Sequence, residues 1–326
     1  TAKGTNHFCF APFWSEKGLA PFELVSPTVF STDINKWGNK QKKEFLGWPR
    51  AGKGTLEHHE KANRKPIWIQ SEEYSFYIQH HISHELKVTL RQAGDDKVSL
   101  LIDNSREEIT LEINKWSSWH HIQLGNDIGM TKFKLLKFDP IEKEIDLLQS
   151  QINKVIGFSN DHQLEEELIN HCGPFISKWT IKASPDELYY ESSFEEAEYQ
   201  AQWLAKAALF LINEKGFSLF STVFRLNDET HHTCLGKCDP SSPFYQPSEA
   251  AKYEETILKS YKVLDKVIGE IMAGSSMDTV IIIASDHGNV PNHYLCDIYR
   301  RLEESGLCKL DFQGEPVWEE TKAYLK

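Results

Sequence analysis

An aspartate and a histidine stand side by side just after the most apolar short run in the second half of the chain. The run Val280–Ala284 is followed, after Ser285, by Asp286-His287-Gly288. Such a run predicts a buried central strand, and ligand sites in α/β sheets lie just beyond the carboxyl ends of strands. Gly288 permits a turn that would let Asp286 and His287 bind one zinc-like ion. The alternative is a capped turn with a buried histidine.

A second aspartate and histidine follow another predicted strand, residues 217–224. Asp228 and His232 are spaced D-x-x-x-H, so a single helical turn places both side chains on one face. Two Asp/His sets at the carboxyl ends of two parallel strands can face one cleft. The alternatives are that Asp228 caps a helix and that His232 is a solvated loop residue.

The elements that must position these residues alternate between helix and strand from about residue 151 onward. This alternation indicates an α/β core built on a mainly parallel sheet. The predicted helices cover residues 162–172 and 184–213, a long stretch that begins at Ser248, and residues 294–305. The predicted strands are the two that precede the Asp/His sets. We therefore predict that strands 217–224 and 279–285 are parallel neighbours or near-neighbours.

The first half of the chain has a different pattern. Residues 66–150 contain short alternating segments separated by turn signals, which predict an antiparallel β-rich module with its own core. Residues 1–65 lack periodicity and are predicted to be irregular. The predicted division is therefore 1–65, 66–150 and 151–326. The candidate core residues of the module are Trp68, Phe76, Val88, Leu100, Leu111 and Trp119.

Four segments carry a family resemblance through their order and spacing. They are Asn227–His232, Asp239–Pro247, the predicted helix from Ala250 to Met272, and Asp278–Asn289. Together they resemble the alkaline phosphatase superfamily, and within it the type I phosphodiesterase/nucleotide pyrophosphatase-like phosphohydrolases. The resemblance covers about residues 145–326. It implies an alkaline-phosphatase-like, mainly parallel sheet flanked by helices, into which the β-rich module is inserted.

The same resemblance implies a function and a metal site. Asp228 and His232 would bind one divalent ion, and Asp286 with His287 the other, the ions being zinc or manganese. The implied activity is metal-dependent hydrolysis of a small-molecule phosphate ester. Both histidines must be neutral to bind, so we expect activity to fall on acidification.

Two parts of the family pattern have no counterpart in this sequence. We find neither an early aspartate with a Thr or Ser nucleophile before residue 150 nor a last histidine after Tyr324. The nucleophile is therefore unknown. We expect the chain to be a central fragment that is catalytically silent, and a polypeptide extended at both ends to be active.

Composition narrows the possible partners. The net charge of −12 over 326 residues argues against a protein that binds duplex nucleic acid. We find no leader and no apolar run of about 18 residues, so we expect no membrane partner and a cytoplasmic location. The six cysteines are too sparse for a disulfide scaffold and are predicted to be reduced and mostly buried. The oligomeric state stays open.

Two other functions remain open. The first is a non-catalytic binding or structural protein on a degenerate phosphatase-like fold, favoured by the missing nucleophile. The second is a nucleotide kinase, because Gly47–Thr55 nearly matches a phosphate-binding loop. Such a loop needs a buried strand before it and a helix after it, which the flanking residues do not predict.

Overall fold

The fold is described from a computed structural model in which most of the chain is placed. The structure describes residues 22–33, 41–46, 53–58, 64–70, 73–79, 85–159 except 104 and 106, 161–293, 298–311 and 316–323. The chain divides into two compact units. The larger unit spans residues 1–39 and 61–290, and the smaller spans 40–60 and 291–326.

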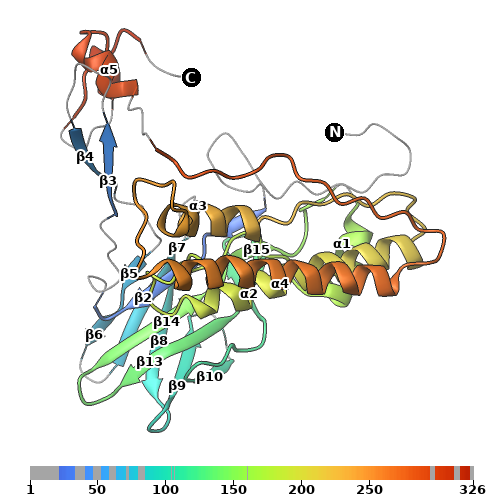
Figure 1. The fold of residues 1–326 in the computed structure, drawn as a ribbon. Helices are drawn as coiled ribbons and strands as arrows, with labels where there is room; N and C mark the ends of the chain where they lie inside the picture. Colours follow the sequence, from blue (N-terminus) through green and yellow to red (C-terminus); the bar gives the residue numbers. More distant parts are fainter. Residues whose placement is uncertain are drawn as a thin grey trace. The chain divides into compact units, whose positions relative to one another are not determined.

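The described strands of the larger unit form three sheets, in which one pair of neighbouring strands is parallel and the others are antiparallel (Figure 1). The five-stranded sheet has the order β10-β9-β8-β7-β6. A four-stranded sheet has the order β13-β14-β2-β5, in which β2 and β5 are parallel, and another has the order β1-β15-β12-β11. The strand bounds are β1 Glu23–Val25, β2 Thr28–Ser31, β5 Arg64–Pro66, β6 Trp68–Gln70, β7 Glu73–Gln79, β8 Glu85–Gln92, β9 Lys97–Ile102, β10 Glu108–Glu112, β11 His120–Leu124, β12 Asp127–Thr131, β13 Phe133–Asp139, β14 Glu144–Gln149 and β15 Ile152–Lys154.

One hydrophobic core joins these sheets face to face. The ring centroids of Phe30 in β2 and Phe76 in β7 are 4.0 Å apart, although the two strands belong to different sheets. Period-two alternation explains the packing, since β7 buries Tyr74, Phe76 and Ile78 and exposes the residues between them or leaves them half-buried. The described strands over residues 66–150 are mostly antiparallel, as predicted, but their core is not separate, because it includes Leu24 of β1 and Phe30 of β2.

Three details differ from the sequence-based expectation. Trp68 is 58% exposed and Trp119 is half-buried, whereas the other four candidate core residues are fully buried. Residues 23–31, for which we predicted irregular coil, form β1 and β2. β1 pairs with β15, and β2 pairs with β14 as well as with β5. β15 and β14 lie more than 100 residues further along the chain, so no local sequence pattern predicts these two pairings.

The helices of the larger unit pack beside one another. They are α1 His162–Cys172, α2 Glu191–Leu209, which continues into the π-helical turn η2 Phe210–Glu214, α3 Leu226–Cys238 and α4 Ala250–Gly274. Both α2 and α3 pack along α4 (Figure 1). The prediction for α1 is confirmed: Asp161 accepts a hydrogen bond from Leu164 N, and Gly173 ends the helix at φ 81°. Among the described residues, none of the helices is at once long and apolar enough to cross a bilayer.

Helix α2 begins later than predicted. We expected a start at Ser184, but residues 184–190 form turns and the helix starts at Glu191. The reason is Tyr189, whose φ of 55° is left-handed and interrupts any helix that runs through it. Helix α2 is tied to the β-rich part through Lys134 of β13, whose Nζ lies 2.7 Å from Glu195 Oε2.

The prediction of two buried parallel strands before the Asp/His sets is wrong in this structure. Residues 217–225 and 279–290 form neither helix nor strand, and they pair with no strand in the described part of the chain. Val280, Ile282 and Ile283 are 82%, 85% and 67% exposed. An apolar run is buried only where neighbouring strands and helices cover it, and none of the described sheets extends to these residues. The mixed α/β character is confirmed, but the described sheets are mostly antiparallel.

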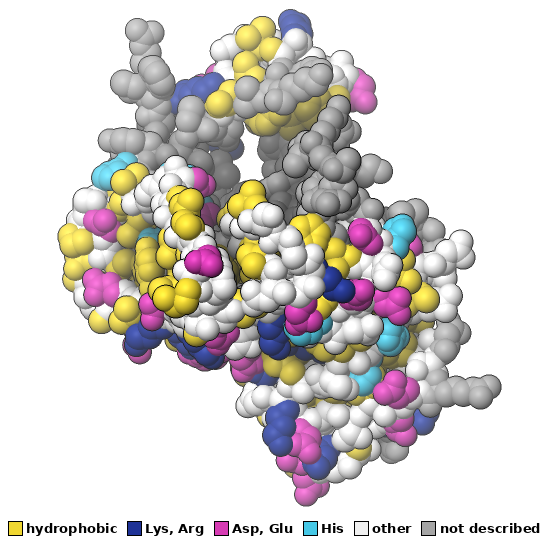
Figure 2. All heavy atoms as spheres, turned by 90° about the vertical axis from the view of Figure 1, so that its right-hand side faces the viewer, with side chains coloured by type: hydrophobic (Ala, Val, Ile, Leu, Met, Phe, Trp, Pro, Cys, Tyr) yellow, Lys and Arg dark blue, Asp and Glu magenta, His cyan; other side chains and the backbone are white. Residues whose placement is uncertain are grey.

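The surface reflects this exposure. Figure 2 shows hydrophobic side chains lying among charged ones on the face that it views. Exposed large apolar side chains of residues 217–225 and 279–290 include Leu219, Val223, Val280, Ile282 and Ile283.

The smaller unit contains a hairpin and two short helices. The hairpin pairs β3 Gln41–Leu46 with β4 Lys53–His58, and the helices are α5 Ile298–Glu304 and the 3-10 turn η3 Trp318–Glu320.

A phosphate-binding loop requires a helix after Thr55, whereas Lys53–His58 is a strand, so the kinase hypothesis is wrong. Residues 47–52 of that motif lie outside the described part. Of the helix predicted over 294–305, residues 294–297 also lie outside it.

The cysteines in the described part behave as predicted. Cys172, Cys234, Cys238 and Cys308 are free and buried. Burial raises the pKa of the Cys172 and Cys234 thiols to about 11, which keeps them protonated and unreactive at neutral pH.

Candidate functional site

Helix α3 positions the first predicted ligand pair. Its buried side is anchored by Leu226, which packs with Val263 and Val267 of α4. Asp228 and His232 lie on a more open side, where Asp228 Oδ1 is 3.3 Å from His232 Nε2. The predicted D-x-x-x-H geometry is therefore present, and the pair can offer a carboxylate oxygen and an imidazole nitrogen to one ion.

The neighbouring histidine is engaged elsewhere. His231 Nδ1 lies 2.7 Å from the carbonyl oxygen of Asn227, and its ring meets Tyr261 of α4 edge to face with centroids 5.8 Å apart. His231 thus helps to hold α3 against α4, while His232 is the histidine that faces Asp228.

The second predicted pair lies in the segment after α4, which is neither helix nor strand. His287 N donates to Asp286 Oδ1 at 3.0 Å, and His287 Nε2 lies 3.4 Å from Asp286 Oδ2. The two adjacent side chains therefore converge, as a turn at this point requires. Both are open to solvent, with Asp286 at 87% and His287 at 57% side-chain exposure.

A backbone contact bears on the orientation of the His287 ring. Its Nδ1 lies 3.2 Å from the carbonyl oxygen of Gly288. When Nδ1–H donates to that carbonyl, Nε2 keeps its lone pair, which is the state in which histidine binds a metal.

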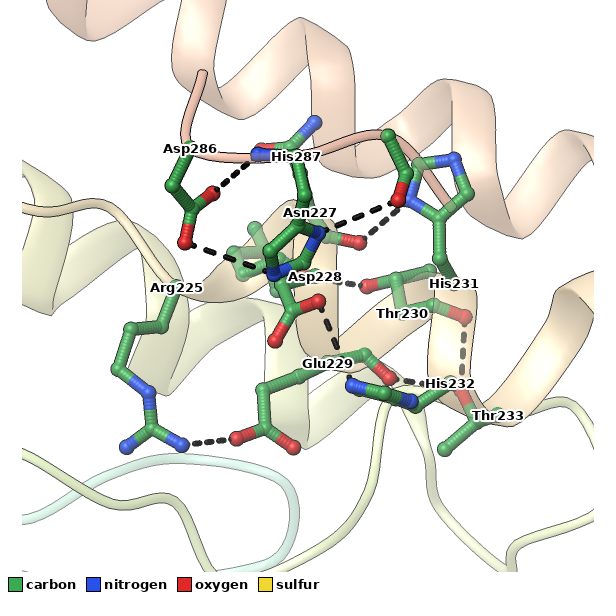
Figure 3. A network of polar contacts seen from close by, with 12 residues as sticks. Arg225, Asn227, Asp228, Glu229, Thr230, His231, His232, Thr233, Asp286 and His287 are labelled. Carbon is green, nitrogen blue, oxygen red and sulfur yellow. Dashed lines mark hydrogen bonds and ion pairs between the residues drawn. The ribbon is translucent and has the colours of Figure 1, made fainter. Parts of the chain in front are cut away.

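The structure brings each pair together but does not assemble the four residues into one cage. Within the described ranges no three or more His, Cys, Asp or Glu side chains are arranged to hold a metal ion. Figure 3 draws Asp286–His287 above Asp228, with His232 further below. Each pair therefore supplies two ligands of the three that zinc usually takes from a protein in catalytic sites.

A buried oxygen at the first pair tests whether a cation fits there. Asp228 Oδ1 is closed to solvent and makes no hydrogen bond, even though the side chain as a whole is 41% exposed. The nearby His232 nitrogen is within ion-pair distance but is not aligned for a hydrogen bond. A buried carboxylate oxygen without a donor is a group whose charge a bound cation would satisfy.

Asn227 is a residue that the sequence-based analysis did not single out. Its Oδ1 and Nδ2 are both closed to solvent and both lack a hydrogen-bond partner. The sequence marks Asn227 as a candidate only by its position, directly before Asp228 at the start of a helix. Next to it, Arg225 and Glu229 form an ion pair across the first turn.

A second buried charged cluster joins α2 to the strands. Lys132 Nζ lies 4.4 Å from the Trp116 ring centroid, 5.3 Å from that of Trp119 and 4.7 Å from that of Tyr199. Burial lowers the pKa of Lys132, and burial raises the pKa of Glu196, which lies near it, to about 7.

The adjacent histidines 120 and 121 lie on opposite faces of β11, as neighbours on a strand must, so one is buried and the other is exposed.

Comparison with known proteins gives one match. The family model described as Type I phosphodiesterase / nucleotide pyrophosphatase matches residues 156–325. No curated protein and no solved structure matches the chain. The matched range contains α1–α5 and both Asp/His pairs, and it leaves the β-rich part outside.

Proposed function

The chain belongs to the type I phosphodiesterase/nucleotide pyrophosphatase family of the alkaline phosphatase superfamily, and we propose on this premise that it hydrolyses phosphate esters at a two-metal site. The family acts on small phosphate esters. The observation that carries the finer proposal is the buried, donor-free Oδ1 of Asp228 beside His232.

Each Asp/His pair of the chain would bind one of the two ions. Asp228 and His232 would hold one ion, and Asp286 with His287 the other, the ions being zinc or manganese. Such ions supply a positive charge that stabilises the attacking and leaving oxygens of a phosphoryl transfer. The Gly288 carbonyl orients the His287 ring, and the α3 turn fixes the Asp228–His232 spacing. We assign no nucleophile.

The carboxylate of the second pair is more exposed than that of the first, and this affects how tightly each pair would hold an ion. Asp286 is 87% exposed and Asp228 41%, whereas the two histidines are similarly exposed. The more exposed carboxylate holds an ion more weakly, because water competes for the ion and the side chain must be ordered on binding. We therefore expect the Asp228–His232 ion to be the tighter of the two.

The test is hydrolysis of a chromogenic phosphodiester and a chromogenic phosphomonoester by the full gene product, with added zinc or manganese. Asp286→Ala should lower kcat/KM at least about 100-fold, which corresponds to about 2.7 kcal/mol of transition-state stabilisation. The matched control is Asp278→Ala, an exposed aspartate at the start of the same segment. Equal activity of the wild type and Asp286→Ala, or no hydrolysis with any divalent ion, would overturn the proposal.

A non-catalytic binding protein is the second candidate. It is favoured by the finding that no group of three ligands is assembled among the described residues. The same assay separates the two candidates, because a binding protein would take up metal or a phosphate ester without turnover.

A further inference from the structure

The amide of Asn227 has two unmet hydrogen-bonding needs in one side chain. Its Nδ2 is a buried donor without an acceptor, and its Oδ1 is a buried acceptor without a donor. If the amide nitrogen and oxygen are exchanged, the side chain still has one unpaired donor and one unpaired acceptor. Buried polar atoms are nearly always paired, so an unpaired amide beside a candidate ligand pair calls for a specific partner.

The partner cannot be the Asp228–His232 ion alone. Neighbouring helix positions point about 100° apart, so Asn227 does not share the face that carries Asp228 and His232. Its own backbone carbonyl is already engaged with His231.

A phosphate group with its cation offers both complementary partners. Phosphoryl oxygens accept hydrogen bonds and satisfy the donor, while the positive ion satisfies the carbonyl-type oxygen. No side chain caps the start of α3 at Arg225, and the positive end of the helix dipole lies at this turn and attracts an anion.

We propose that Asn227 binds the phosphoryl group of the substrate, with its amide nitrogen donating to a non-bridging oxygen. This inference rests on the proposed function and deepens it, because it names a residue that recognises the phosphate rather than the metal. Asn227 then contributes to selection of phosphate esters by the site.

The test measures the midpoint of thermal unfolding of the chain in three states: without additions, with manganese, and with manganese plus inorganic phosphate. We expect manganese to raise the wild-type midpoint and phosphate to raise it further. Asn227→Leu, which has a similar volume and no amide, should keep the manganese shift and lose the phosphate shift. Its midpoint without additions should equal or exceed that of the wild type, because an unpaired buried amide is removed.

Two further variants sharpen the comparison. Asn227→Asp should also lose the phosphate shift, because a carboxylate repels the anion. Asn213→Leu is the matched control, since the Asn213 amide donates to the Gly274 carbonyl at 2.9 Å. That variant should have a lower midpoint without additions and an intact phosphate shift.

The outcomes separate the two proposals. A phosphate shift that persists in Asn227→Leu, or a lower midpoint of that variant without additions, overturns the assignment of Asn227. A wild type that responds to manganese but not to phosphate overturns it as well. A wild type without a manganese shift contradicts the two-metal site, and loss of a phosphate shift in Asn227→Leu would then still support the Asn227 assignment.

Discussion

Asp228 Oδ1 and His232 Nε2 lie 3.3 Å apart across one turn of α3. Helix formation alone creates this proximity, because positions i and i+4 share a face. The pair is therefore assembled as soon as α3 forms, whereas the second pair depends on the conformation of a segment without helix or strand.

Replacement of single histidines in α3 separates binding from packing. His232→Ala should weaken zinc or manganese binding at least about 10-fold, because it removes one of two ligands of the ion. His231→Ala should leave metal affinity within about twofold and lower the free energy of unfolding, because it loses the contacts to Asn227 and Tyr261. Isothermal titration calorimetry and urea unfolding measure the two effects. Equal effects of the two variants on affinity would contradict the assignment.

Glu196 predicts a pH dependence of stability. The side chain is fully buried and accepts hydrogen bonds from Thr180 N at 2.7 Å and Thr180 Oγ1 at 3.0 Å. Burial raises its pKa from 4.5 to about 7, against the opposing effects of the Thr180 backbone hydrogen bond and of the Lys132 charge. A raised pKa in the folded state means that the stabilisation is complete below about pH 4.5 and is lost as the pH rises through about 7.

Glu196→Gln removes this titration while keeping the shape of the side chain. Between about pH 4.5 and 7 we expect the wild-type free energy of unfolding to fall relative to that of the variant by on the order of 3 kcal/mol. Urea unfolding at several pH values measures the difference. Glu270→Gln, an exposed site on α4, is the control and should follow the wild-type curve. A constant difference between wild type and Glu196→Gln across this range would contradict the prediction.

Truncation of two apolar side chains checks the exposure of the segment after α4. Ile282 is 85% exposed, so Ile282→Ala should change the free energy of unfolding by no more than about 0.5 kcal/mol. Leu147 of β14 is fully buried, and Leu147→Ala should cost about 2–5 kcal/mol. If Ile282→Ala costs as much as Leu147→Ala, the segment is buried in solution as the sequence pattern had suggested.

Two glycines give opposite expectations for the same substitution. A Cβ on Gly129 of β12 would meet Ile152 Cγ2 at 2.6 Å and the Asn153 carbonyl oxygen at 2.8 Å, so Gly129→Ala should destabilise by about 1–3 kcal/mol. A Cβ on Gly269 in α4 would meet nothing within 4 Å, so Gly269→Ala should stabilise by about 0.5–1 kcal/mol through helix propensity. Thermal unfolding measures whether each variant is less or more stable than the wild type. A stabilised Gly129→Ala would mean that β12 and β15 are not packed as described.

Several features followed from the sequence because they depend on neighbours close along the chain. The extent of α1, the long helix α4 and the Asp228–His232 pair all depend on residues a few turns apart at most. The antiparallel strands of residues 66–150 follow from period-two alternation and short turns. Family membership was also within reach, since the motifs that carry it are local.

Tertiary structure alone decided the rest. The five apolar residues Val280–Ala284 have the pattern of a buried strand. They are exposed because no strand in the described part of the chain pairs with them, and burial needs neighbours from distant parts of the chain. Tyr189 moved the start of α2 through a backbone angle that residue type does not specify. The unmet hydrogen bonds of Asn227 are likewise invisible in sequence, because whether a polar group is paired depends on what the fold places around it.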